Sequence, residues 1–171
     1  IKGVKGKRVL VRVDFNVPLK QKTKNKKQET IIEDDTRIKA VLPTINYLKD
    51  KSAKVILISH LGEPDMKSKI SVKGGSASGG KSLPRRQAGQ GFSLKPIAVK
   101  LSEILGQKVT FVADCLGTKV KIAVKKMKAG DSLLLENLRF YPGDKENDKK
   151  FAKDLASLAQ IYVNDAFAVS H

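Results

Sequence analysis

Short runs of apolar residues alternate along the chain with longer segments whose apolar positions recur at helical spacing. The run Arg8–Val13 and a stronger run over residues 54–59 are rich in β-branched residues, which predicts two strands. Between them, residues 36–51 carry apolar side chains three and four positions apart, which predicts a helix with Asp35 as its cap. Pro43 lies inside this segment and predicts a kink or a break in the helix.

The same alternation continues through the rest of the chain. Helices are predicted over residues 93–105, 118–128 and 148–159, and strands over residues 108–112, 132–136 and 161–163. Short apolar strands separated by helices are typical of a parallel sheet that is covered on both faces. The pattern therefore predicts a single α/β domain over residues 1–171, with a doubly wound, Rossmann-like sheet of five strands.

Two segments interrupt this alternation. Residues 20–30 contain five lysines, one glutamate and no apolar residue, so we expect a solvated loop or turn. Residues 65–91 are rich in Gly and Ser and carry six cations against one acid, which predicts a low-complexity insertion. Within it, residues 75–82 match the phosphate-binding loop pattern G-x-x-x-x-G-K-[ST]. We interpret this match as chance, because a convincing strand before it and a helix after it are both missing.

Composition narrows the classes of protein that fit. The chain has 171 residues, which suits one domain, and its formal net charge of +17 favours contact with phosphates, nucleic acid or an acidic surface. Much of the excess charge lies in the two interrupting segments, so we expect nucleic acid to bind only by non-specific charge. The single Cys115 excludes an internal disulfide, and two histidines are too few for most metal centres. No apolar stretch is long enough to span a membrane, so we expect a soluble, cytoplasmic protein.

Polar residues follow the predicted strands at the points where the strands end, the edge at which doubly wound sheets bind ligands. They are Asp14 and Asn16, His60, Asn137 and Arg139, and Asn164 and Asp165. Each one alone could be a turn former, a core histidine or a surface cation, but together they indicate a shared site.

Arg37 lies in the first turn of a predicted helix, where the helix dipole disfavours a cation, and an anionic ligand would explain its position. Two arginines and a histidine suit a small phosphorylated or carboxylated ligand, because guanidinium groups bind such anions bidentately. Ser59 and His60 point to opposite faces of a strand, so we do not expect a nucleophile and base pair.

Six motifs in this sequence closely resemble phosphoglycerate kinase. They occur in the family's order and cover the chain outside residues 20–30 and 65–91: GKRVLVRVDFNVP at 6–18, DDTRI at 34–38, LPTI at 42–45, SHLG at 59–62, LENLRF at 135–140 and VNDAF at 163–167. The resemblance is to the N-terminal domain of that enzyme.

The resemblance implies reversible phosphoryl transfer between 1,3-bisphosphoglycerate and ADP, in glycolysis or carbon fixation, with 3-phosphoglycerate held by this domain. By the same resemblance, Arg37 is the catalytic residue that stabilises charge on the transferring phosphoryl group, and His60 and Arg139 bind the 3-phosphate. Asp14 and Asn16 contact the hydroxyl and carboxylate end. The implied substrate-binding positions are Asp14, Phe15, Asn16, Arg37, His60, Leu61, Gly62, Glu63, Arg139 and His171.

The sequence departs from the family pattern in ways that bear on function. Glu63 stands where the family has a phosphate-binding Arg, so we expect weaker substrate affinity, unless Arg85 or Arg86 replaces the missing cation. Residues 168–170 read AVS where the family usually has GTA.

The resemblance covers only the N-terminal domain, and it implies that Mg²⁺ with ADP or ATP is bound by a separate C-terminal domain. We therefore expect no cofactor or metal in this chain, no phosphoryl transfer by the chain alone, and its own C-terminal domain as its partner, in a monomer. The alternative is a non-catalytic basic subunit of a larger assembly, such as a ribonucleoprotein. A plastid is the alternative compartment.

Overall fold

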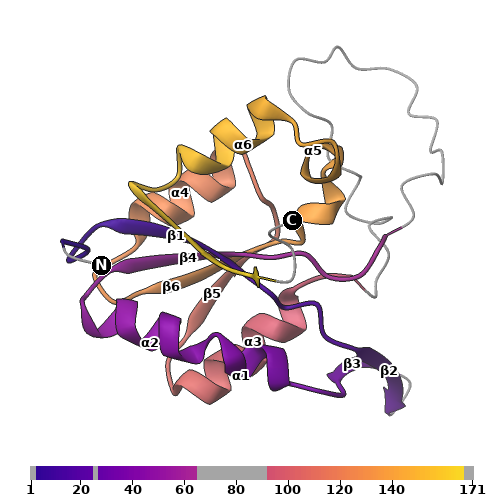
Figure 1. Ribbon diagram of the computed structural model, residues 1–171. Helices are drawn as coiled ribbons and strands as arrows, with labels where there is room; N and C mark the ends of the chain where they lie inside the picture. The colour runs from indigo at the N-terminus through magenta and orange to yellow at the C-terminus, as the bar shows by residue number, and fades with distance from the viewer. Residues whose placement is uncertain (1–2, 25–26, 65–91, 168–171) are drawn as a thin grey trace.

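The computed structural model describes residues 3–24, 27–64 and 92–167 (Figure 1). Its centre is a five-stranded parallel sheet in the order β5-β6-β4-β1-β7, which confirms the predicted α/β fold. The strands are β1 (Arg8–Val13), β4 (Lys54–Ile58), β5 (Val109–Val112), β6 (Ser132–Leu135) and β7 (Ile161–Asp165). Because all five run the same way, their carboxyl ends meet at one edge of the sheet.

Helices cover both faces of this sheet, as Figure 1 shows. One face packs against α1 (Thr36–Ala40), α2 (Leu42–Asp50) and α3 (Lys95–Leu105), and the other against α4 (Thr118–Lys126) and α6 (Lys149–Ala156). Two short elements follow β6 near the carboxyl edge, the 3-10 helix η1 (Leu138–Phe140) and α5 (Pro142–Lys145). The sequence did not predict η1 or α5, which are only three and four residues long and so too short to show a hydrophobic period.

The alternation of side chains along β1 builds two cores at once. Val9, Val11 and Val13 are fully buried on the face covered by α1, α2 and α3, whereas Leu10 is buried on the opposite face. Arg12 has the same parity as Leu10, so it projects to the face of α5 and α6 near the carboxyl end of the strand. The strand pattern thus points a guanidinium group at the edge where ligands bind in such sheets.

The predicted loop over residues 20–30 is wrong. Strands β2 (Leu19–Lys24) and β3 (Lys27–Ile32) form an antiparallel hairpin outside the main sheet, with Leu19 paired to Ile32. Leu19 and Ile32 lie on either side of the polar residues 20–30 and pack against the main core. The hairpin register extends from this pair. A segment without apolar residues is ordered here by backbone pairing and by the apolar residues at its base.

The predicted helix over residues 36–51 is two helices. Val41 ends α1 and precedes α2, and Pro43 lies in the first turn of α2, where its missing N–H costs no helix hydrogen bond. Asp35 occupies the position before α1, but its side chain makes no capping hydrogen bond, which corrects the prediction. It pairs instead with Lys39 at 2.8 Å and Lys100 at 3.6 Å. Within the described residues, no helix has the length and apolar content needed to cross a membrane.

Candidate anion site

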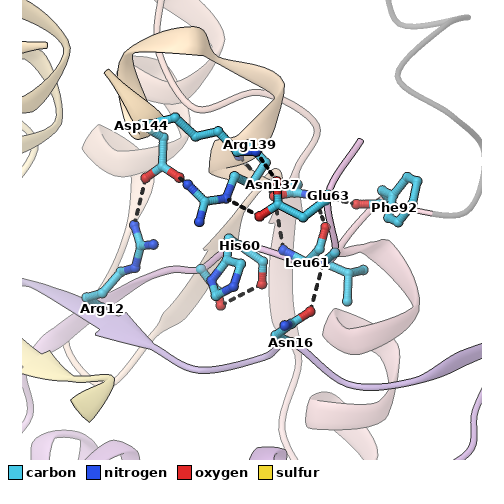
Figure 2. A network of polar contacts seen from close by, with 12 residues as sticks. Arg12, Asn16, His60, Leu61, Glu63, Phe92, Asn137, Arg139 and Asp144 are labelled. Carbon is cyan, nitrogen blue, oxygen red and sulfur yellow. Dashed lines mark hydrogen bonds and ion pairs between the residues drawn. The ribbon is translucent and has the colours of Figure 1, made fainter. Parts of the chain in front are cut away.

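Asp144 joins two arginines that come from distant parts of the chain. Its Oδ1 accepts a hydrogen bond from Arg12 at 3.1 Å, and its Oδ2 accepts one from Arg139 at 2.9 Å (Figure 2). The Asp144 side chain is only 9% exposed, so this carboxylate is a fixed support between the two guanidinium groups. The Nε atoms of both Arg12 and Arg139 are buried and form no hydrogen bond within the described structure.

His60 lies beside this pair of arginines at the end of β4. It is 5% exposed, and its buried Nδ1 also has no hydrogen-bond partner within the described structure. Burial lowers the pKa of His60 below its usual value, and the positive charges of Arg12 and Arg139 lower it further. Three neighbouring side chains, Arg12, His60 and Arg139, thus each have a buried nitrogen with unmet hydrogen-bonding capacity, an arrangement that suits an anion with several acceptor oxygens.

Asn137 fixes the position of the loop that contains His60. This fully buried amide accepts hydrogen bonds from the backbone N–H of Leu61 at 3.1 Å and of Arg139 at 3.0 Å. Its Nδ2 donates to the carbonyls of Leu61 at 2.8 Å and of Phe92 at 2.9 Å. One side chain thus fixes the loop after β4, the start of η1 and the segment before α3 in their relative positions (Figure 2).

Asp14 and Asn16 follow β1 and form hydrogen bonds at the neighbouring part of the carboxyl edge of the sheet. Asp14 Oδ1 accepts from the backbone N–H of Asn16 at 3.0 Å, and Asn16 Oδ1 accepts from the N–H of Gly62 at 2.8 Å. Arg37, which is half exposed, donates to Asp14 Oδ2 at 2.5 Å. The Asp14 carboxylate is therefore one anion beside Arg37 in the first turn of α1, the position for which the sequence predicts an anionic ligand.

Gly62 and Glu63 continue the loop from His60. Gly62 has a φ of +56°, and the ring of Phe92 fills the space that a Cβ would need, so both the backbone and the packing require glycine here. Glu63 is 60% exposed, lies 3.5 Å from Nε of Arg139 and also pairs with Lys145. The hydrogen bond from Lys145 holds the pKa of Glu63 below its usual value.

The predicted positions that lie within the described residues fall into two groups. Asp14, Asn16, Arg37, His60, Gly62, Glu63 and Arg139 lie along the carboxyl edge of the sheet. Phe15 and Leu61 are buried in the core, at 0% and 2% exposed, and support the site through packing. His171, Arg85, Arg86 and residues 75–82 lie outside the described residues.

Ser59 is a structural residue in this fold. Its buried hydroxyl donates to the carbonyl of Val13 at 2.7 Å and accepts from the N–H of Phe15 at 2.9 Å, which ties β4 to β1. Its engagement with backbone groups agrees with the expectation that Ser59 and His60 form no nucleophile and base pair.

Sequence reasoning missed Arg12, Asp144 and Lys145. A signal for Arg12 was present, because an arginine at a position facing a core, one residue before the end of an apolar strand, needs a partner. Asp144 and Lys145 gave no such signal, since they belong to a four-residue helix in a polar stretch. Within the described residues, no group of three or more His, Cys, Asp or Glu side chains could hold a metal ion.

The fold and this edge define an α/β domain with a cluster of basic side chains at the carboxyl ends of its parallel strands. Residues 2–171 match the family model described as phosphoglycerate kinase. The chain therefore belongs to the phosphoglycerate kinase family, a family of phosphotransferases, and corresponds to its N-terminal part.

Individual relatives agree with this assignment. The chain is 48% identical over 166 residues to phosphoglycerate kinase of Borrelia garinii subsp. bavariensis and 49% identical over 172 residues to that of Dictyoglomus turgidum. These matches cover 97% and 98% of this chain but 35% of each relative's length. The crystal structure of phosphoglycerate kinase from Pyrococcus horikoshii OT3 superposes with a TM-score of 0.70 at 31% identity, covering 98% of this chain and 36% of that one. The corresponding TM-score for phosphoglycerate kinase from Coxiella burnetii is 0.68 at 35% identity, covering 98% of this chain and 34% of that one.

Proposed function

We propose that this domain binds 3-phosphoglycerate and its acyl phosphate, 1,3-bisphosphoglycerate, for reversible phosphoryl transfer with ADP and ATP. The observation that carries the proposal is that Arg12, His60 and Arg139 lie near one another (Figure 2), and that Nε of Arg12, Nδ1 of His60 and Nε of Arg139 are buried without a hydrogen-bond partner. A phosphate group offers several acceptor oxygens for these nitrogens, and its negative charge compensates the positive charge of the two arginines. Membership of the phosphoglycerate kinase family supports this choice of ligand.

Arg37 is proposed to act on the transferring group. Its side chain is 51% exposed and rests on Asp14, so it is positioned near the edge yet free to turn toward an incoming anion. Phosphoryl transfer depends on positioning and charge stabilisation, and a guanidinium group supplies both without covalent chemistry. Asp14 and Asn16 would then hold the hydroxyl and carboxylate end of the ligand beside it.

Calorimetric titration with 3-phosphoglycerate at low ionic strength tests the proposal. We expect binding by the unmodified chain and a loss of about tenfold or more in affinity for both Arg139→Gln and His60→Gln. Lys5→Gln is the matched control, because Lys5 is exposed and precedes β1, at the opposite end of the sheet. Equal affinity in all four proteins, or no binding at all, would contradict the proposal.

The 171 residues by themselves are proposed to bind the substrate without transferring phosphate. The chain spans about a third of the length of the relatives it matches, and the family resemblance assigns the nucleotide to the part that it does not cover. Mixing the chain with 3-phosphoglycerate and MgATP should release no ADP above background. Sustained release would refute this expectation.

We also propose a monomer that acts in the cytoplasm.

One observation favours a second candidate, a basic subunit of a larger assembly. Residues 118–128, which include α4, hold five exposed lysines and no acidic residue: Lys119, Lys121, Lys125, Lys126 and Lys128. Such a face would attract a polyanion such as RNA. Stoichiometric co-purification with a ribonucleoprotein that survives nuclease and high salt would support this candidate, whereas loss of the association under either treatment would not.

A further inference from the structure

Glu63 places a carboxylate against two cations of the anion site. One oxygen lies within ion-pair distance of Arg139, 3.5 Å from Nε, and the other accepts a hydrogen bond from Nζ of Lys145. Nε of Arg139 is one of the three buried nitrogens without a hydrogen bond, so Glu63 stands next to an atom that the phosphate of the ligand would need. Figure 2 shows Glu63 approaching Arg139 on the side away from Asp144.

The two carboxylates around Arg139 are held very differently. Asp144 is 9% exposed and contacts two arginines, so removing it would leave buried positive charge uncompensated. Glu63 is 60% exposed, and its partner Lys145 is 51% exposed. Exposed ion pairs contribute little free energy, and Glu63 can therefore turn into solvent at small cost.

We propose that Glu63 is a displaceable internal counter-ion, which competes with the phosphate group of the ligand for Arg139 and Lys145. This inference rests on the proposed function of the site. When the phosphate binds, the Glu63 carboxylate turns away, and Arg139 and Lys145 become available to the ligand together. Lys145 is then a further phosphate-binding cation, presented by the end of α5.

The test compares binding of 3-phosphoglycerate to the unmodified chain, Glu63→Gln and Glu103→Gln by calorimetry at low ionic strength. Glu103 is exposed near the end of α3, and its replacement changes net charge equally without touching Arg139 or Lys145. We expect Glu63→Gln to bind about tenfold more tightly and Glu103→Gln to change affinity by less than about twofold. Equal gains in the two variants would overturn the inference, since they would show only a general effect of charge.

A second background tests the role of Lys145. In the Lys145→Gln background, Glu63→Gln should increase the affinity for 3-phosphoglycerate by a smaller factor, because one of the two cations that the carboxylate neutralises is gone. A gain that stays the same in this background would overturn the assignment of Lys145. Thermal unfolding of each variant checks that the fold is retained, and Glu63→Ala should reproduce the tighter binding of Glu63→Gln.

A measurement without ligand separates this inference from the proposed function. The ¹H–¹⁵N signal of Arg139 Nε should shift in Glu63→Gln and stay in place in Glu103→Gln. An unmoved signal would overturn the contact itself. Binding of equal strength to the unmodified chain and to Glu63→Gln would overturn only the competition, whereas absence of binding in every variant would overturn the proposed function.

Discussion

Asn137 and Leu61 exchange two hydrogen bonds, one in each direction, between a side-chain amide and a backbone 76 residues away. We expect Asn137→Ala to lower the free energy of unfolding by about 3 kcal/mol, because buried backbone groups lose their partners. Urea denaturation measures this loss. A change below about 1 kcal/mol would show that water or a shifted loop replaces the amide.

Gly62 is expected to resist replacement more strongly than another glycine with nearly the same backbone angle. In Gly62→Ala the new methyl group overlaps the Phe92 ring, whereas Gly106→Ala, at a φ of +59°, finds nothing within 4 Å. Both variants carry backbone strain of about 1 kcal/mol, and Gly62→Ala should lose about 1 to 3 kcal/mol more through overpacking. Equal melting temperatures for the two variants would contradict this account.

Arg12 should contribute to binding through the shape of its guanidinium group as well as through its charge. In Arg12→Lys the charge is kept, but one ammonium group cannot contact Asp144 and also present a second nitrogen to a ligand. We expect affinity for 3-phosphoglycerate to fall by about tenfold, measured by calorimetry. Unchanged affinity would show that Arg12 only attracts the ligand at long range.

His60 should titrate below the usual range of a histidine, and binding of a phosphate should raise its pKa. Because the folded state depresses this pKa, the unfolded chain takes up the proton first as the pH falls. The contribution of His60 to stability is therefore present above the usual pKa of about 6.5 and is lost as the pH falls below it.

NMR titration of the histidine Hε1 signals measures this pKa with and without 3-phosphoglycerate. The signal that disappears in His60→Gln identifies the residue, since the chain has only two histidines. A pKa at or above the usual value in the free protein would contradict the prediction.

Cys115 should be inert in the folded protein. Its thiol is buried and donates to the carbonyl of Glu136, and burial raises the pKa of Cys115 well above its usual value. We expect labelling by a thiol reagent at pH 8 to proceed only as fast as the domain opens, and to become rapid in denaturant. Rapid labelling under native conditions would contradict the buried position.

Sequence reasoning predicted the main sheet well because most of its strands are short apolar runs separated by helices of clear period. It failed at the hairpin of β2 and β3, where residues 20–30 offer no apolar alternation and the pairing depends on Leu19 and Ile32 at the base. It found His60 and Arg139 because polar residues at the ends of buried strands stand out from their surroundings.

The amino-acid pattern alone specifies the alternation of strands and helices, and hence the edge at which charged side chains gather. Which of these charges face each other depends on how the elements pack in three dimensions. Arg12 and Asp144 are 132 residues apart and Glu63 and Lys145 are 82 apart, and no local pattern records such pairs. The physical reason is that hydrophobic periodicity acts within one element, whereas an ion pair depends on how separate elements pack at the same edge of the sheet.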